Sequence, residues 1–131
     1  MFNFLKKKTV VKTESEAQLT EEQQDEMRKK IEQIKREIDT PELADKELAE
    51  KYEELGLLLA QLKEDEQAIA MLEKSQIYKN SIGAGYKKLL NLYNQKRAEA
   101  ARNGDDGGID HWMNKMDEMR QIAKQVTIGG K

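Results

Sequence analysis

Two helical segments separated by a short polar break, over residues 48–80, constrain the fold of this 131-residue chain more than any other stretch. In the first segment, apolar residues recur at steps of three and four along one helical face: Leu48, Tyr52, Leu55, Leu59 and Leu62. Leu57 and Leu58 fall on other faces of the same helix. Because it is apolar on more than one side, we expect this helix to be covered by two neighbouring helices.

A glycine and an alanine predict how the two segments cross. Gly56 lies in the middle of the first segment, where glycine costs about 1 kcal/mol relative to alanine. Since glycine has no Cβ, it lets the backbone of a second helix approach closely. Ala68 is a small residue in the second segment and suits close contact opposite this glycine. We therefore predict that Gly56 and Ala68 touch across an antiparallel helical hairpin.

These residues and their spacing resemble the tetratricopeptide repeat (TPR), a helix–turn–helix motif of 34 residues. The aromatic, Leu-Gly, second aromatic, alanine and large apolar positions of that pattern correspond to the following residues: Tyr52, Leu55, Gly56, Leu59, Ala68 and Leu72. Three positions depart from it, because Leu59 replaces an aromatic residue, Ser75 a small alanine and Asn80 the closing proline. The alternative is an antiparallel helical hairpin of another kind with a tight Gly/Ala crossing.

A second copy of the pattern begins at Tyr86, 34 residues after Tyr52. Leu89 takes the leucine position and Tyr93 the second aromatic position, while Leu90 stands where the pattern has glycine. An interval equal to the repeat length strengthens the resemblance more than either copy does alone. The resemblance implies a binding scaffold built from helical hairpins.

The resemblance also implies where a peptide would bind. In TPR domains the first helix of each repeat lines a concave groove, which in the first copy corresponds to five residues: Glu50, Glu53, Leu57, Ala60 and Gln61. Some TPR domains clamp the terminal carboxylate of a peptide with a lysine and an asparagine one helical turn apart. Lys87 and Asn91 match that pair, and their spacing of four places both on one face. The alternative is that both are ordinary exposed residues.

Caps and a narrow stripe predict the N-terminal helices. Thr20 and Gln23 form a capping box that begins the first helix. Its apolar residues make a single edge, so this helix is expected to cap the array on one side: Met27, Ile31, Ile34 and Ile38. Pro41, with Thr40 as N-cap, is predicted to open a second helix over about 41–63.

Further helices are predicted beyond that point, beginning with a third over about 65–79. Ser81 is the expected cap of a fourth helix, which a glycine-rich loop at 103–108 ends with a left-handed residue. An EF-hand assignment of that loop fails, because Gly107 stands at a ligand position and Asn114 at the position that needs glutamate.

The fifth predicted helix carries the clearest amphipathic stripe: Ile109, Trp112, Met113, Met116, Met119, Ile122, Ala123 and Val126. Methionine repacks easily, so this stripe suits an adaptable binding face, although such stripes also form ordinary cores. A single neighbouring helix cannot easily cover all of it. We expect its uncovered part to be an interface with a partner or in a homodimer, formed by four residues: Trp112, Met113, Met116 and Met119.

The predicted fold is therefore all-α: a five-helix antiparallel array with an N-terminal capping helix and two TPR-like helical hairpins, over residues 19–127. A single domain of this class fits a chain with 37% charged residues, 5% aromatic residues and one proline. Residues 1–18 are expected to form a flexible basic tail, and residues 128–131 a disordered one.

Composition and absent motifs argue against several functions. The net charge of −2 gives no case for binding nucleic acid, and the lack of cysteine excludes thiol catalysis and thiolate metal sites. His111 is the single histidine, and it lies beside Asp110 with no nucleophile motif. The sequence has neither a phosphate-binding glycine loop nor spaced metal ligands. We expect no enzymatic activity, no cofactor and no metal.

The expected function is non-catalytic binding of proteins or peptides in the cytoplasm. An alternative is a peripheral membrane factor, because Phe2 and Phe4 precede three lysines at 6–8. Apolar side chains can enter a lipid interface while lysines meet anionic headgroups, which would give residues 2–8 a weak contact with the inner membrane surface. The same residues also suit a terminus with no role.

Overall fold

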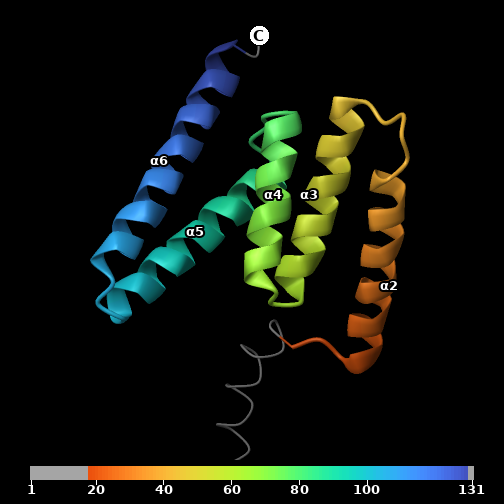
Figure 1. The fold of residues 1–131 in the computed structure, drawn as a ribbon, viewed down its shortest axis with the longest axis horizontal. Coiled ribbons are helices and arrows are strands. Elements are labelled where there is room, and N and C mark those ends of the chain that lie inside the picture. Colours follow the sequence, from red (N-terminus) through yellow and green to blue (C-terminus); the bar gives the residue numbers. More distant parts are fainter. Residues whose placement is uncertain (1–17, 130–131) are drawn as a thin grey trace, which may run out of the picture.

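The computed structural model describes residues 18–129, and all secondary structure in this range is helical. Figure 1 shows five helices with these bounds: α2 (Glu21–Ile38), α3 (Asp45–Gln61), α4 (Asp65–Tyr78), α5 (Ala84–Arg102) and α6 (Asp106–Gly129). The prediction of an all-α array of five helices is confirmed. Residues 1–17, which include the predicted lipid contact, and residues 130–131 lie outside the described residues.

The helices form two parts that meet at α5. α2, α3 and α4 pack side by side, and consecutive helices in this part run in opposite directions (Figure 1). α5 packs on α4 and also contacts α3, at a slant to both, and α6 returns along α5. In Figure 1, α6 begins at the lower left, well away from α4, and leans toward the top of α4 at its C-terminal end.

α2 caps the array through one apolar edge, as predicted. The Thr20 hydroxyl accepts a hydrogen bond from the Gln23 amide, and the Gln23 side chain accepts one from the Thr20 amide, both at 3.0 Å. Ile31 and Ile34 are the buried residues of α2, and both belong to the hydrophobic core. Ile38 packs against this core, Met27 is half-buried, and most other residues of α2 are exposed.

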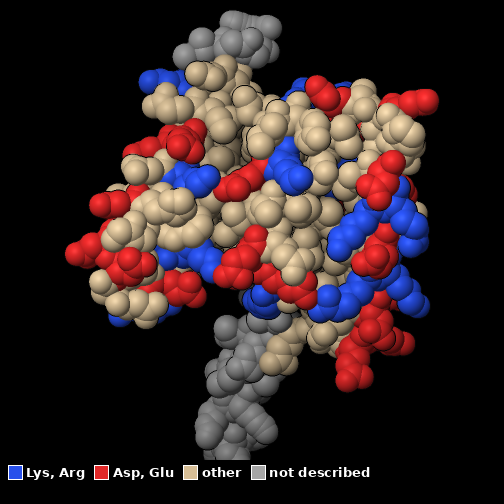
Figure 2. Space-filling model, in the orientation of Figure 1, with Lys and Arg blue, Asp and Glu red and all other residues tan. Residues whose placement is uncertain are grey.

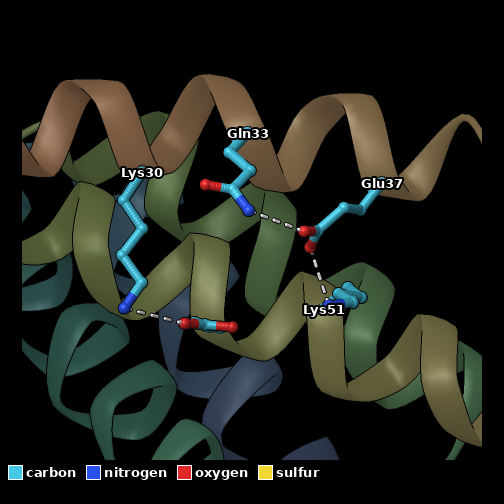
Figure 3. A network of polar contacts seen from close by, with 5 residues as sticks. Lys30, Gln33, Glu37 and Lys51 are labelled. Carbon is cyan, nitrogen blue, oxygen red and sulfur yellow. Dashed lines mark hydrogen bonds and ion pairs between the residues drawn. The ribbon is translucent and has the colours of Figure 1, made fainter.

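Polar contacts along the α2–α3 seam add to that apolar edge (Figure 3). The Lys51 ammonium lies 2.7 Å from one oxygen of Glu37, and Gln33 donates to the other oxygen at 3.0 Å. The hydrogen bond from Lys51, and then the one from Gln33, lower the pKa of the Glu37 carboxyl, while the same contact raises the pKa of Lys51. Both groups therefore stay charged around neutral pH. Farther along the seam, Lys30 lies 3.6 Å from Glu54.

The predicted start of the second helix is wrong. Pro41 lies in a turn, and α3 begins at Asp45. The Ala44 amide donates to the Glu47 side chain at 3.1 Å. An acidic residue in the first turn therefore caps the N-terminus of this helix, the role that was expected of Thr40. Acidic groups in the first turn also suit the positive end of the helix dipole, which favours a start at this point.

The predicted cap of the fourth helix is also wrong, because α5 begins at Ala84. The Gln76 amide holds the Ser81 backbone instead, donating to its carbonyl at 3.0 Å and accepting from its N–H at 3.1 Å. Glu53 of α3 supplies the acceptor for the first turn of α5, since its carboxylate accepts from the Gly85 amide at 2.7 Å. A distant side chain thus replaces the local cap.

The loop before α6 contains the predicted left-handed residue. Gly104 has a φ of 69°, a conformation that glycine adopts without a steric penalty. The Asp105 carboxylate accepts from the Gly108 amide at 2.9 Å and so caps α6. At the other end the backbone remains helical through Ile128 and Gly129, two residues that the sequence pattern placed in a disordered tail.

The crossing of α3 and α4 is as close as predicted, but the residue facing Gly56 is different. A Cβ built on Gly56 would lie 2.6 Å from Leu72 Cγ and 3.2 Å from the Leu72 backbone nitrogen. Leu72 follows Ala68 by one helical turn, and both side chains are buried in the core. The Ser75 hydroxyl adds a buried hydrogen bond across the hairpin, donating to the Ala49 carbonyl at 2.7 Å.

We predict that Gly56→Ala destabilises the chain by about 1–3 kcal/mol, because the new methyl group has no room beside Leu72. This loss exceeds the gain in helix propensity of about 1 kcal/mol. Urea unfolding followed by circular dichroism measures the difference. Gly107→Ala is the matched control, since its Cβ would meet only an ordinary contact at 3.8 Å. Equal midpoints for Gly56→Ala and wild type would refute the tight crossing.

Candidate functional site

A groove with a volume of about 510 Å³ lies between α4 and α6, and α5 forms its floor. Its lining comprises Glu73, Gln76, Ile77, Tyr78, Lys79 and Asn80 from α4 and the following turn, Leu89 and Tyr93 from α5, and Lys115, Glu118, Met119 and Ile122 from α6. Figure 1 shows α6 to one side of α4, with α5 running from α4 to the start of α6.

Helical spacing brings the wall residues to one face of each helix. The α4 wall contains Glu73, Gln76 and Ile77, and the α6 wall contains Lys115, Glu118, Met119 and Ile122. Positions three and four apart on a helix are neighbours on its surface. Each wall therefore presents charged and apolar side chains together.

A polar bridge joins the three helices at the floor of the groove. The Tyr93 hydroxyl donates to the Glu73 carboxylate at 2.5 Å, and the Lys115 ammonium lies 3.4 Å from the same oxygen. Burial, and then the hydrogen bond to Glu73, raise the pKa of Tyr93 far above its ordinary value of 10.0. The phenol therefore remains protonated and keeps donating over the whole neutral range.

Apolar side chains surround this bridge, and one of them is strongly exposed. Leu89 and Met119 are buried and Ile122 is half-buried, so apolar side chains line the groove beside the bridge. Ile77 on the α4 wall is 79% exposed, the highest value among the large apolar residues of the described chain. An apolar side chain with this exposure at the edge of an apolar groove is typical of a surface that binds another molecule.

Charges of both signs lie around the groove. Glu73 and Lys79 belong to the α4 side, and Lys115 and Glu118 belong to the α6 side. The face shown in Figure 2 likewise has acidic and basic side chains interspersed rather than gathered by sign. A strongly acidic or strongly basic partner is therefore not favoured, and the rim suits a partner that itself carries both signs.

The groove residues expected from the TPR resemblance on α3 do not form one surface. Glu50 and Glu53 come together in a smaller cavity of about 190 Å³, which Lys79 also lines, and Glu53 caps α5 as described. Leu57 packs against the core. Gln61 is exposed and lines a separate cavity against the start of α2.

The predicted carboxylate clamp lies apart from these residues. Lys87 and Asn91 are both exposed on α5, and neither lines any of the cavities described here. The Asn91 side-chain oxygen accepts from the Gln95 amide at 3.1 Å, which is a contact within the same helix. The structure thus does not bring Lys87 and Asn91 into one site with Glu50 or Gln61.

The predicted interface stripe on α6 divides into inner and outer members. Met119 is buried, and Trp112 and Met116 pack against the core. The Trp112 ring lies against Tyr93, with 5.7 Å between ring centroids. Met113 is 49% exposed and stands outside the groove. Most of the stripe therefore faces α5, and Met113 is its exposed member.

Sequence reasoning missed the α4 wall of the groove. Ile77 lies off the apolar stripe of the second helical segment. A large apolar residue at such a position was the sequence signal of an exposed apolar side chain, and the structure shows Ile77 to be exposed. Tyr78 also lines the groove, although it is 37% exposed and stacks on Tyr52, with ring centroids 5.6 Å apart. The groove itself depends on the angle between α4 and α6, which no local pattern encodes.

Residues 18–129 contain neither a membrane-spanning helix nor a metal-binding cluster. No helix in this range combines the length and apolar character that a bilayer crossing requires. The same residues hold no cluster of three or more His, Cys, Asp or Glu side chains placed to bind a metal ion.

Comparisons with known proteins yielded no relative. No protein-family model matches the chain, and no match was found among curated proteins or among solved structures.

The polar bridge predicts a measurable coupling between Tyr93 and Glu73. Tyr93→Phe is expected to lower the free energy of unfolding by about 1–2 kcal/mol, since a hydrogen bond to a charged acceptor is lost. Glu73→Ala in the Tyr93→Phe background should then cost less than it does in wild type. Urea unfolding of the two single variants and the double variant gives the coupling energy. Strictly additive effects would show that the bridge does not stabilise the junction of α4 and α5.

Proposed function

We propose that this chain is a non-catalytic module that binds a protein or peptide, and that the groove between α4 and α6 is its binding surface. The exposure of Ile77 beside an apolar floor is the observation that carries the proposal. Binding would remove this side chain from water, which is worth about 1.5–3 kcal/mol for a fully buried isoleucine.

The polar groups of the groove support a binding role rather than a catalytic one. The Tyr93 hydroxyl and the Glu73 carboxylate are engaged with each other, and the raised pKa of Tyr93 opposes its action as a nucleophile or base. The lining of the groove contains no His, Cys or Ser side chain. These groups hold the helices together and fix the shape of the surface.

The α3–α4 and α5–α6 hairpins support a scaffold of the TPR type. The two pairs of helices are consecutive and antiparallel, and equivalent tyrosines at 52 and 86 recur at the repeat length. The proposed binding surface differs from the one that the resemblance implies, since it uses α4 and α6. On this proposal the protein acts in the cytoplasm.

The test is selective capture of a partner by the immobilised chain. Ile77→Lys should lose proteins that the wild-type chain retains from a lysate of cells that express it, because a charge replaces the apolar contact. The exposure of Ile77 means that the fold does not depend on it. Met113→Glu is the matched control, since Met113 is exposed but lies outside the groove. If all three baits retain the same proteins, the groove is not the binding surface.

A second candidate is a peripheral membrane factor, which the sequence of residues 2–8 supports through two phenylalanines and three lysines. Sedimentation with vesicles containing anionic lipid tests it. The full chain should co-sediment, and a variant with Phe2→Ser and Phe4→Ser should not. Equal sedimentation of the two proteins would dismiss insertion of the phenylalanines. Binding that disappears at high salt for both would indicate attraction by lysines alone.

A further inference from the structure

We propose that the occupant of the groove is the C-terminal half of α6, residues 121–129, from a second copy of this chain, in a symmetric dimer. This inference rests on the proposed function, because it names an occupant for the same surface. It follows from the apolar stripe of α6, from the charge of its C-terminal half and from the symmetry of the two surfaces.

The apolar stripe of α6 continues beyond the part that α5 covers. Ile122 is the last α6 residue packed against the hydrophobic core of the described chain. Val126 lies one turn farther on, half-buried and outside that core. In Figure 1 the corresponding end of α6 projects above the top of α4. The stripe therefore offers an apolar edge that a second molecule can cover.

The C-terminal half of α6 is also unusually poor in charge. Residues 121–129 read QIAKQVTIG and contain one charged residue, Lys124, in a chain of which 37% is charged. Charged residues are depleted from the buried cores of interfaces because their desolvation is costly. A segment with this composition suits insertion into a groove that Leu89, Met119 and Ile122 line with apolar side chains.

The single charge of this segment has an opposite charge available on the groove. Glu118 lies on the α6 wall and is exposed, while Glu73 is already held by Tyr93 and Lys115. Lys124 of the second copy can therefore meet Glu118 at the rim while the apolar edge of the helix enters the groove. Opposite charges at the rim favour one orientation of the inserted helix.

Symmetry makes the arrangement close on itself. The groove and the inserted segment belong to the same chain, so two copies related by a two-fold axis fill both grooves at once. Each dimer would then contain two identical contacts in which Ile77 of one copy meets Val126 of the other. The uncovered apolar side chains of both surfaces are removed from water together.

Sedimentation equilibrium of the full chain tests the self-association. Wild type should show a monomer–dimer equilibrium, and Ile77→Lys should weaken it by at least about tenfold, because each dimer loses two apolar contacts. Met113→Glu should leave it unchanged. Circular dichroism should show equal helicity for all three proteins, since both altered residues are exposed.

Cross-linking identifies the inserted segment, and the natural chain offers a clean background because it has no cysteine. An equimolar mixture of an Ile77→Cys chain and a Val126→Cys chain should form a disulfide-linked heterodimer on mild oxidation, since that bond requires close approach of the two positions. A mixture of Ile77→Cys with Met113→Cys is the matched control and should remain largely unlinked.

Several results would overturn the inference. A chain that stays monomeric at every concentration would do so, as would a dimer unaffected by Ile77→Lys or a preferential link to position 113. If the Phe2→Ser, Phe4→Ser variant loses the dimer and positions 77 and 126 do not cross-link, the segment that mediates the dimer is the N-terminal one and not α6. If the chain is monomeric but Ile77→Lys still loses a captured protein, the inference fails while the proposed function stands.

Discussion

The close packing of α3 on α4 at Gly56 is the constraint on which the rest of the structure depends. Leu72 occupies the space that a Cβ at Gly56 would need. At the same helix pair, the Ser75 hydroxyl donates a buried hydrogen bond to the Ala49 carbonyl of α3. The two helices can therefore act as a rigid pair. α2 covers one side of α3, and α5 contacts both helices of the pair. The Glu53 carboxylate projects from α3 to the first turn of α5, so the pair also determines where α5 begins.

The groove is a consequence of how α5 is held. Its first turn is fixed to α3 through Gly85, and its middle is joined to α4 and α6 by the bridge of Tyr93, Glu73 and Lys115. α6 packs on α5 rather than on α4, so the two walls of the groove are joined mainly through α5. The polar bridge thus serves two purposes. It joins three helices, and its residues form part of the floor of the groove.

Local sequence patterns predicted the helices well, because periodicity and caps act over a few residues. The capping box at Thr20 and the left-handed Gly104 are examples, since each depends only on its neighbours. The predicted helix starts at Pro41 and Ser81 were wrong. For α5 the acceptor is Glu53 on another helix, which no local pattern contains. For α3 the acceptor is local, since Glu47 accepts from the Ala44 amide three residues before it, but an alanine at this position is not a recognisable cap. Because Glu53 caps α5, it is not part of a peptide groove of the kind that the TPR resemblance implied. The α4 wall of the groove depends on the angle between α4 and α6, which local sequence does not encode.

In the groove, apolar side chains supply most of the free energy of binding, whereas charged side chains determine the orientation of the bound partner. Ion pairs at an exposed rim contribute only about 0–1 kcal/mol each, so Lys79 and Glu118 cannot by themselves hold a partner. Burial of Ile77 can supply more than that, because it is strongly exposed and a fully buried isoleucine is worth about 1.5–3 kcal/mol. Any occupant must therefore bring an apolar edge, and the alternating charges then select its direction along the groove. A helix with one apolar edge and few charges meets both requirements, whereas a highly charged extended peptide meets neither.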